Sequence, residues 1–109
     1  MGYFYAFGTD TPAAPGATAI PACTVTIPVG HRAMVRRVDA FALDATGTTF
    51  YVYAGGVPVW AGAIPGIGAL GADTFIYVDA LAAAVVLLGY QDQVTASTLG
   101  GMAISGIYQ

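Results

Sequence analysis

The sequence predicts an all-β fold: a single jelly-roll-like antiparallel β-sandwich of about eight short strands with an extended N-terminal arm. Three observations lead to this prediction. Short segments rich in β-branched and aromatic residues recur along the chain, and turn signals separate them. No stretch combines the apolar period of a helix with capping residues. A length of 109 residues suffices for one domain with one small core.

The N-terminal segment is predicted to be an arm, which divides the chain into residues 1–22 and a sandwich domain of residues 23–109. Tyr3–Phe7 is short, aromatic and strand-like, and Thr9–Ala22 carries three prolines among small residues, as extended linkers do. An aromatic strand that a long linker separates from the next strand is expected to pair with a neighbour's sheet and not to stay unpaired. We therefore expect residues 1–20 to contact another subunit or a different protein.

The next two strands are predicted from alternation of polar and apolar residues. Thr24–Ile27 alternates as a half-buried strand does, and residues 28–30 read Pro-Val-Gly, a turn. His31–Asp44 is long enough for a strand of about a dozen residues. Its alternation slips at Arg36 and Arg37, which predicts a β-bulge that turns both side chains away from the core.

The clearest turns flank a hairpin. Asp44–Gly47 has the residue pattern of a type I turn. Thr48–Ala54 is a strand candidate, and Gly55-Gly56 is a two-residue hairpin turn that leads into Val57–Gly62. Because Pro58 cannot donate a ladder hydrogen bond, this last strand is predicted to lie at a sheet edge or to carry a bulge.

The C-terminal half is predicted to contain a glycine-rich loop and four further strands. Ala80–Leu88 is the one helix candidate, since alanine and leucine favour helices, but it overlaps an apolar strand pattern. The predicted segments are a loop at Ala63–Ala72, strands at Thr74–Asp79 and Ala84–Gly89, and a last hairpin of Val94–Thr98 and Met102–Tyr108 closed by Gly100-Gly101.

The composition predicts a chain whose surface is covered by other protein. Hydrophobic residues make up 57% and charged residues 8%, with three Arg, six Asp and a net charge of −3. A dispersed soluble domain normally carries about 25–35% charge on its surface. A membrane span is disfavoured because glycines and prolines interrupt the uncharged stretch Ala45–Ala72, and Ala80–Tyr90 is shorter than the roughly 20 residues that a span needs.

The residues that carry chemistry do not form an evident active site, and we expect no enzyme, no cofactor and no bound metal. Nucleophilic catalysis needs a Ser, Cys or Thr, a base and an orienting acid. His31 is the only histidine, so a His-based triad would have to use it, for example with Cys23 and Asp39. We expect instead an exposed His31 and a buried Cys23. A zinc site needs about four ligands. The glycine pattern in PGIGALGA lacks the following helix of a dinucleotide site, and three arginines make no basic face for nucleic acid.

Three features are candidate interaction surfaces. The arginines either lie on a solvated strand face or pair with Asp residues of a neighbour. Trp60, with Tyr51 and Tyr53 across the hairpin, belongs to the core, to a subunit interface or to a sugar-binding platform. The loop Ala61–Ala72 is apolar and would be an exposed patch in a monomer, and such patches mark interfaces. The predicted interface comprises Tyr3, Phe4, Tyr5, Phe7, Arg32, Arg36, Arg37, Trp60, Ile64, Ile67 and Leu70.

Three segments together resemble a group of small phage virion proteins. Met34–Asp39 is similar to a V-V-R-x-V-D strand, Gly55–Gly62 to a glycine hairpin that leads into Trp-x-Gly, and Ser105–Tyr108 to a terminal S-G-Y-like strand. This pattern resembles the β-sandwich decoration and minor tail proteins of long-tailed bacteriophages, notably those that infect actinobacteria.

The chain departs from that pattern at two places. Ile107 separates Gly106 from Tyr108, and residues 89–92 read Gly-Tyr-Gln-Asp in place of a Pro-Gly-Asp turn. The resemblance implies a structural role in the virion. We therefore expect a non-enzymatic capsid-decoration or minor tail protein that binds copies of itself, as a trimer, and other virion proteins such as the major capsid or tail proteins. The alternative is a carbohydrate-binding module of a tail fibre that recognises the host surface.

Overall fold

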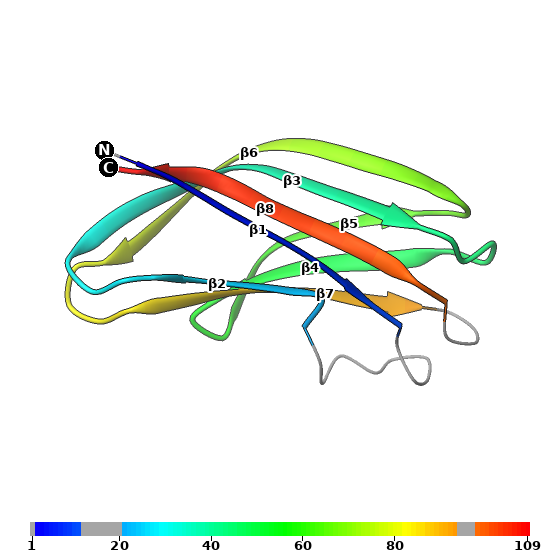
Figure 1. The fold of residues 1–109 in the computed structure, drawn as a ribbon, viewed down its shortest axis with the longest axis horizontal. Helices are drawn as coiled ribbons and strands as arrows, with labels where there is room; N and C mark the ends of the chain where they lie inside the picture. Colours follow the sequence, from blue (N-terminus) through cyan, green and yellow to red (C-terminus); the bar gives the residue numbers. More distant parts are fainter. Residues whose placement is uncertain (1, 12–20, 94–97) are drawn as a thin grey trace.

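The structure is a computed structural model that describes residues 2–11, 21–93 and 98–109. The described residues form eight β-strands in two antiparallel sheets that pack face to face (Figure 1). In spatial order, sheet A contains β1 (Tyr3–Asp10), β8 (Gly100–Tyr108), β3 (His31–Ala42) and β6 (Gly68–Ala80), and sheet B contains β2 (Cys23–Ile27), β7 (Val85–Gln93), β4 (Thr48–Ala54) and β5 (Val57–Ile64).

The order of the strands is that of a jelly roll, which confirms the predicted fold class. Only β4 and β5 are consecutive strands of one sheet, and every other connection passes from one sheet to the other. Two four-stranded sheets joined in this way make the double Greek key of a jelly roll. The two ends of the chain consequently lie side by side, where β1 pairs with β8 (Figure 1).

The core lies between the two sheets and consists of their inner side chains. Its largest fully buried side chains include Phe50 and Leu87 from sheet B and Ile104 and Met102 from sheet A. In strands such as β4 and β7, every second residue is directed into this layer, as the pleat of a β-strand requires. The other face of each sheet is left to solvent or to a partner.

The strand β1 corrects the prediction of a free N-terminal arm. Tyr3–Asp10 pairs with Gly100–Ile107 of the same chain along its whole length, and Phe4 is buried in the core. The strand is therefore an edge of its own sheet. The long connection to the next strand misled the prediction, because a jelly roll places its first and last strands side by side. Residues 12–20 of the predicted arm lie outside the described residues.

The predicted turns and the edge strand are confirmed. Gly47 donates a backbone hydrogen bond to Asp44, which closes the first turn. Gly55 and Gly56 have φ angles of 57° and 83°, which only glycine adopts at little cost, and they connect β4 to β5. The strand β5 is an edge of sheet B, and its register slips next to Pro58.

Two predicted loops are wrong. The glycine-rich segment Ala63–Ala72 is mostly strand, since β5 ends at Ile64 and β6 begins at Gly68. Gly100 and Gly101 do not close a hairpin but begin β8, where their hydrogen atoms leave room for the side chains of Gln91 and Phe41. The candidate helix at Ala80–Leu88 is absent, because Val85 already begins β7. Residues 94–97 of the predicted Val94–Thr98 strand lie outside the described residues.

The predicted bulge in β3 is confirmed between Val35 and Arg37, in the pairing with both neighbouring strands. It shifts the phase of the strand, so that Val35 and Val38 both face the core while the two arginines between them are exposed. A bulge interrupts the backbone hydrogen bonds between two strands, so some backbone groups need other hydrogen-bond partners. Here the buried hydroxyl of Thr74 on β6 donates a hydrogen bond of 2.7 Å to the Val35 carbonyl oxygen.

Replacing the buried and the exposed phenylalanine of β1 tests whether this strand belongs to its own sheet. Phe4→Ala is expected to lower the free energy of unfolding by about 3–5 kcal/mol, because it leaves a cavity in the core. Phe7→Ala, three residues along the same strand, is expected to change it by less than about 0.5 kcal/mol. Urea unfolding followed by circular dichroism measures both; equal, small effects would mean that β1 is detached.

Removing the hydroxyl group of Thr74 tests the closure of the bulge. Thr74→Val is expected to cost about 1–3 kcal/mol of unfolding free energy, because the buried Val35 carbonyl loses its donor. Thr74→Ser keeps the hydroxyl group and serves as the control for that loss. If both variants unfold at the same urea concentration as the wild type, the hydrogen bond does not stabilise the bulge.

Candidate association surface

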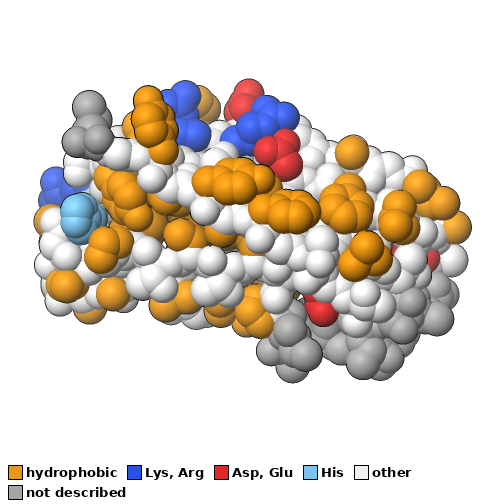
Figure 2. Space-filling model, viewed as in Figure 1, with side chains coloured by type: hydrophobic (Ala, Val, Ile, Leu, Met, Phe, Trp, Pro, Cys, Tyr) orange, Lys and Arg blue, Asp and Glu red, His pale blue; other side chains and the backbone are white. Residues whose placement is uncertain are grey.

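The outer face of sheet A carries five exposed aromatic side chains in two rows, one along each edge strand. Tyr3, Tyr5 and Phe7 form the β1 row and are 87%, 67% and 56% exposed. Phe75 and Tyr77 form the β6 row and are 70% and 71% exposed. Figure 2 shows hydrophobic side chains gathered in a band that follows β1 and β8. Apolar surface concentrated in this way on a small domain is characteristic of a binding face.

Between the two rows, the outward side chains of β8 are mostly small. Ser105, Ala103 and Gly101 lie opposite Tyr5, Phe7 and Thr9, whereas Ile107 lies opposite Tyr3. A hollow of about 370 Å³ opens at one end, lined among others by Tyr3, Tyr5 and Ser105, and a smaller one of about 110 Å³ lies beside Phe7. Small residues between large ones give the face a shape into which a partner's side chains can pack.

Charged groups on this face pair with each other within the chain. Arg37 donates hydrogen bonds from Nε to Asp39 Oδ1 (2.9 Å) and from Nη1 to Asp73 Oδ1 (3.1 Å). The hydrogen bond to Asp39, supported by that carboxylate's charge and by Asp73, raises the pKa of the Arg37 guanidinium above its ordinary value. Arg32 stands opposite Asp79 in the β3–β6 ladder. Arg37 thus pairs with two carboxylates of its own chain, and the expectation that it also pairs with an Asp of a neighbour stays a prediction.

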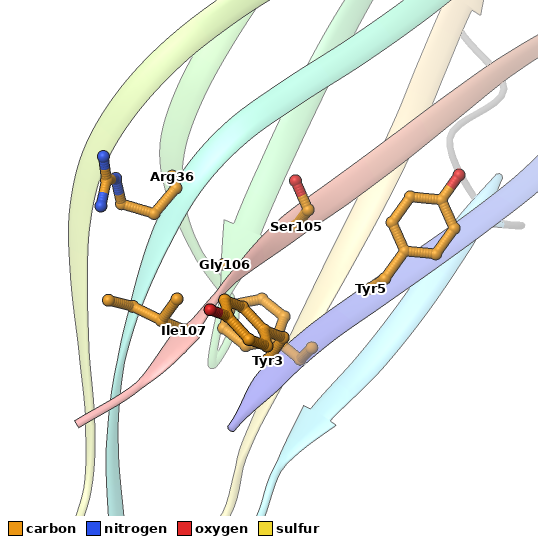
Figure 3. Close-up of a pocket in the computed structure, with 7 residues that line it drawn as sticks. Tyr3, Tyr5, Arg36, Ser105, Gly106 and Ile107 are labelled. Carbon is orange, nitrogen blue, oxygen red and sulfur yellow. The ribbon is translucent and has the colours of Figure 1, made fainter. Parts of the chain in front are cut away.

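Arg36 differs from its neighbour in having no ion pair among the described residues. Its Cζ lies 5.6 Å from the centroid of the Phe75 ring, a cation–π contact. Figure 3 shows its side chain extending from β3 toward β6, on the far side of Ser105 from the two tyrosines. A guanidinium that lies over an aromatic ring can still donate hydrogen bonds from its edge to a carboxylate.

The structure brings together six of the eleven residues predicted to form an interface. Phe4 and Ile64 are corrections, since both are buried in the chain's own core and expose only 5% of their surface. Trp60 and Leu70 are half-buried against that core. Ile67 is exposed, but it lies in the turn between β5 and β6. The six residues on the outer face of sheet A are Tyr3, Tyr5, Phe7, Arg32, Arg36 and Arg37.

The β6 row was not predicted from the sequence. Phe75 and Tyr77 alternate along β6 with Ile76 and Val78, which face inward. Both sets are apolar, so the two-residue period alone does not indicate which set is exposed. The flanking residues Asp73 and Asp79 share the odd-numbered face, and they were the one signal of its exposure.

Trp60 does not form a sugar-binding platform with the tyrosines of β4. Trp60 pairs with Val52, whose side chain is fully buried, and so faces the core. The indole ring passes over Gly62, where a Cβ would lie only 2.7 Å from it. Tyr51 and Tyr53 lie on the opposite face of sheet B, where Tyr53 packs edge-on against Tyr90. The option of a core Trp60 is the one that fits the structure.

Cys23, His31 and Asp39 do not come together. Cys23 is buried between the sheets, and this burial raises the pKa of its thiol to about 11, so it is neutral at pH 7. His31 is exposed and packs against the Tyr108 ring, and Asp39 holds Arg37 on the outer face of sheet A. No group of three potential metal-ligating side chains occurs among the described residues. In the same part of the chain, no helix is long and apolar enough to cross a membrane.

Comparison with known proteins shows the fold alone. No protein-family model matches the sequence, and no curated protein matches it. A GH26-CBM35 β-(1,4)-mannanase from Podospora anserina is similar in structure, with a TM-score of 0.53 and 9% identity over 97% of this chain and 28% of that chain.

Two other solved structures are more distant. The carbohydrate-binding module CBM36 in complex with calcium and xylotriose has a TM-score of 0.49 and 13% identity, and each chain is covered completely. The coat protein of Tobacco streak virus has a TM-score of 0.34 and 13% identity, over 94% of this chain and 85% of that chain. Several of the matched chains are much larger, and this chain spans between 13% and 33% of their length.

Proposed function

We propose that this protein is a non-enzymatic structural component of a tailed phage particle, a capsid-decoration or minor tail protein that works by association. The observation that carries this proposal is the outer face of sheet A. Five large aromatic side chains there are exposed in the isolated chain, although burying them would be favourable. A structural protein is stabilised when such a face is buried in an assembly, whereas a dispersed monomer with this face exposed would be prone to aggregate.

The composition supports the same proposal. Charged residues make up only 8% of the chain, so little of its surface is charged. All three arginines lie on the outer face of sheet A, at or beside the aromatic rows. Polar groups set among aromatic residues are typical of protein–protein interfaces, where Tyr, Phe and Arg are enriched and Lys and Glu are depleted.

The resemblance to phage virion proteins supports the proposal that the assembly is a phage particle. Two of the three similar segments contribute to this face, because Met34–Asp39 contains the β3 bulge with its arginines, and Ser105–Tyr108 is the end of β8. The third segment, Gly55–Gly62, lies in the β4–β5 hairpin of sheet B. The proposed location of the protein is therefore the virion, and its proposed partners are other virion proteins.

Mass spectrometry of purified particles tests this proposal. Particles of the phage that encodes the chain are expected to contain the protein at a fixed copy number relative to the major capsid protein. The copy number is expected to stay constant through density-gradient purification, since an assembled component does not wash off. Lysates in which the protein is abundant, but from which purified particles lack it, would contradict the proposal.

The hollow beside the β1 row favours a second candidate, a carbohydrate-binding module. Exposed tyrosine rings next to the Ser105 hydroxyl and the Arg36 guanidinium offer a stacking surface with polar groups, as sugar sites do. On a glycan array, binding by this module is expected to be lost in Tyr5→Ala and kept in Tyr53→Ala, which alters the other sheet. An array on which the wild type binds no glycan would contradict this second candidate.

A further inference from the structure

We infer that the outer face of sheet A is the surface through which two copies of this chain bind each other. The inference deepens the proposed function, on which it rests, by naming the partner of that face. The two aromatic rows and the small outward residues of β8 between them belong to the same side of the same sheet. A second copy therefore offers both large side chains and small residues against which they would pack.

The charges on this face fit a second copy. It carries three arginines, Arg32, Arg36 and Arg37, and three aspartates, Asp39, Asp73 and Asp79, so its formal charge is zero. The net charge of −3 comes from the other three aspartates, at positions 10, 44 and 92. Two such faces meet without net repulsion. A strongly acidic or basic partner would gain little from a neutral face, because charge complementarity guides binding.

The size of the face is sufficient for a specific contact. Strands lie about 4.8 Å apart and rise about 3.3 Å per residue. Each strand of sheet A has at least eight residues. Four such strands give a face of roughly 500 Å² per copy, or roughly 1,000 Å² in total, which reaches the minimum for a biological interface and is below the standard size of about 1,200–2,000 Å². Face-to-face packing of sheets is the same interaction that holds the sandwich together.

Arg36 gives the contact a polar element. Within the described residues it has no carboxylate partner, unlike Arg37, which has two. Its stacking on Phe75 ties its position to the β6 row. When a second copy covers that row, the guanidinium loses water, and a carboxylate of the other copy replaces the water. The contact is therefore expected to weaken in high salt as well as on loss of the aromatic rings.

Sedimentation equilibrium of the full chain tests this inference. Tyr5→Glu and Tyr77→Glu place a charge in the β1 row and in the β6 row, on side chains that are exposed in the single chain. Each is expected to weaken self-association by about 100-fold or more, because an unpaired charge would be buried in the contact. Val57→Glu places the same charge on an exposed position of sheet B and is expected to leave association unchanged. Thermal melts of all variants establish that the single chain stays folded.

The outcomes separate this inference from the proposed function. A wild type that stays monomeric at micromolar concentration, yet is present in particles at a fixed copy number, overturns the inference and leaves the virion proposal standing. In that case another virion protein covers the face. Association that persists in both aromatic variants, or that is lost equally in Val57→Glu, also overturns it. Association lost only in the aromatic variants supports the inference, even if purified particles lack the protein and the virion proposal fails.

Discussion

The bulge in β3 is the constraint on which the outer face of sheet A depends. A regular strand would turn one of two consecutive residues into the core, and a buried unpaired Arg36 or Arg37 would be strongly destabilising. The bulge resolves this by shifting the phase between Val35 and Val38, so that both valines stay buried. The hydrogen bond from Thr74 to the Val35 carbonyl oxygen closes the gap that the shift leaves. Both arginines then join the aromatic rows on one exposed face.

Much of the fold followed from local signals. The turn at Asp44, the glycine hairpin and the slipped alternation at the two arginines each have a local physical cause, and all three are present in the structure. The predictions that failed concern contacts between residues far apart in the sequence. Nothing near Tyr3–Phe7 indicates that its partner is the last strand, and Gly100-Gly101 has the composition of a turn. Those glycines serve packing against Gln91 and Phe41, which only the assembled sandwich shows.

Only part of the candidate association surface could be predicted from the sequence. Aromatic residues at alternate positions near the N-terminus and three arginines on one strand were visible in the sequence, and they lie on the same face. Their neighbours Phe75 and Tyr77 were not, because β6 is apolar on both faces and its orientation is set by Thr74 and the core. Phe4 and Ile64 were assigned to the interface because their segments were predicted to be a free arm and an apolar loop, whereas both segments are edge strands whose inward residues are buried.

Hydroxyl-radical footprinting of the wild type at low and high protein concentration tests whether copies of the chain bind through sheet A, because it measures the solvent exposure of individual aromatic rings. We expect Tyr3, Tyr5, Phe7, Phe75 and Tyr77 to be oxidised readily in dilute solution and to become protected together as concentration rises. The rings of Tyr51 and Tyr53, on the outer face of sheet B, are predicted to keep the same reactivity throughout. Unchanged oxidation of the five rings of sheet A at every concentration, or protection of the sheet B tyrosines instead, would contradict binding through sheet A.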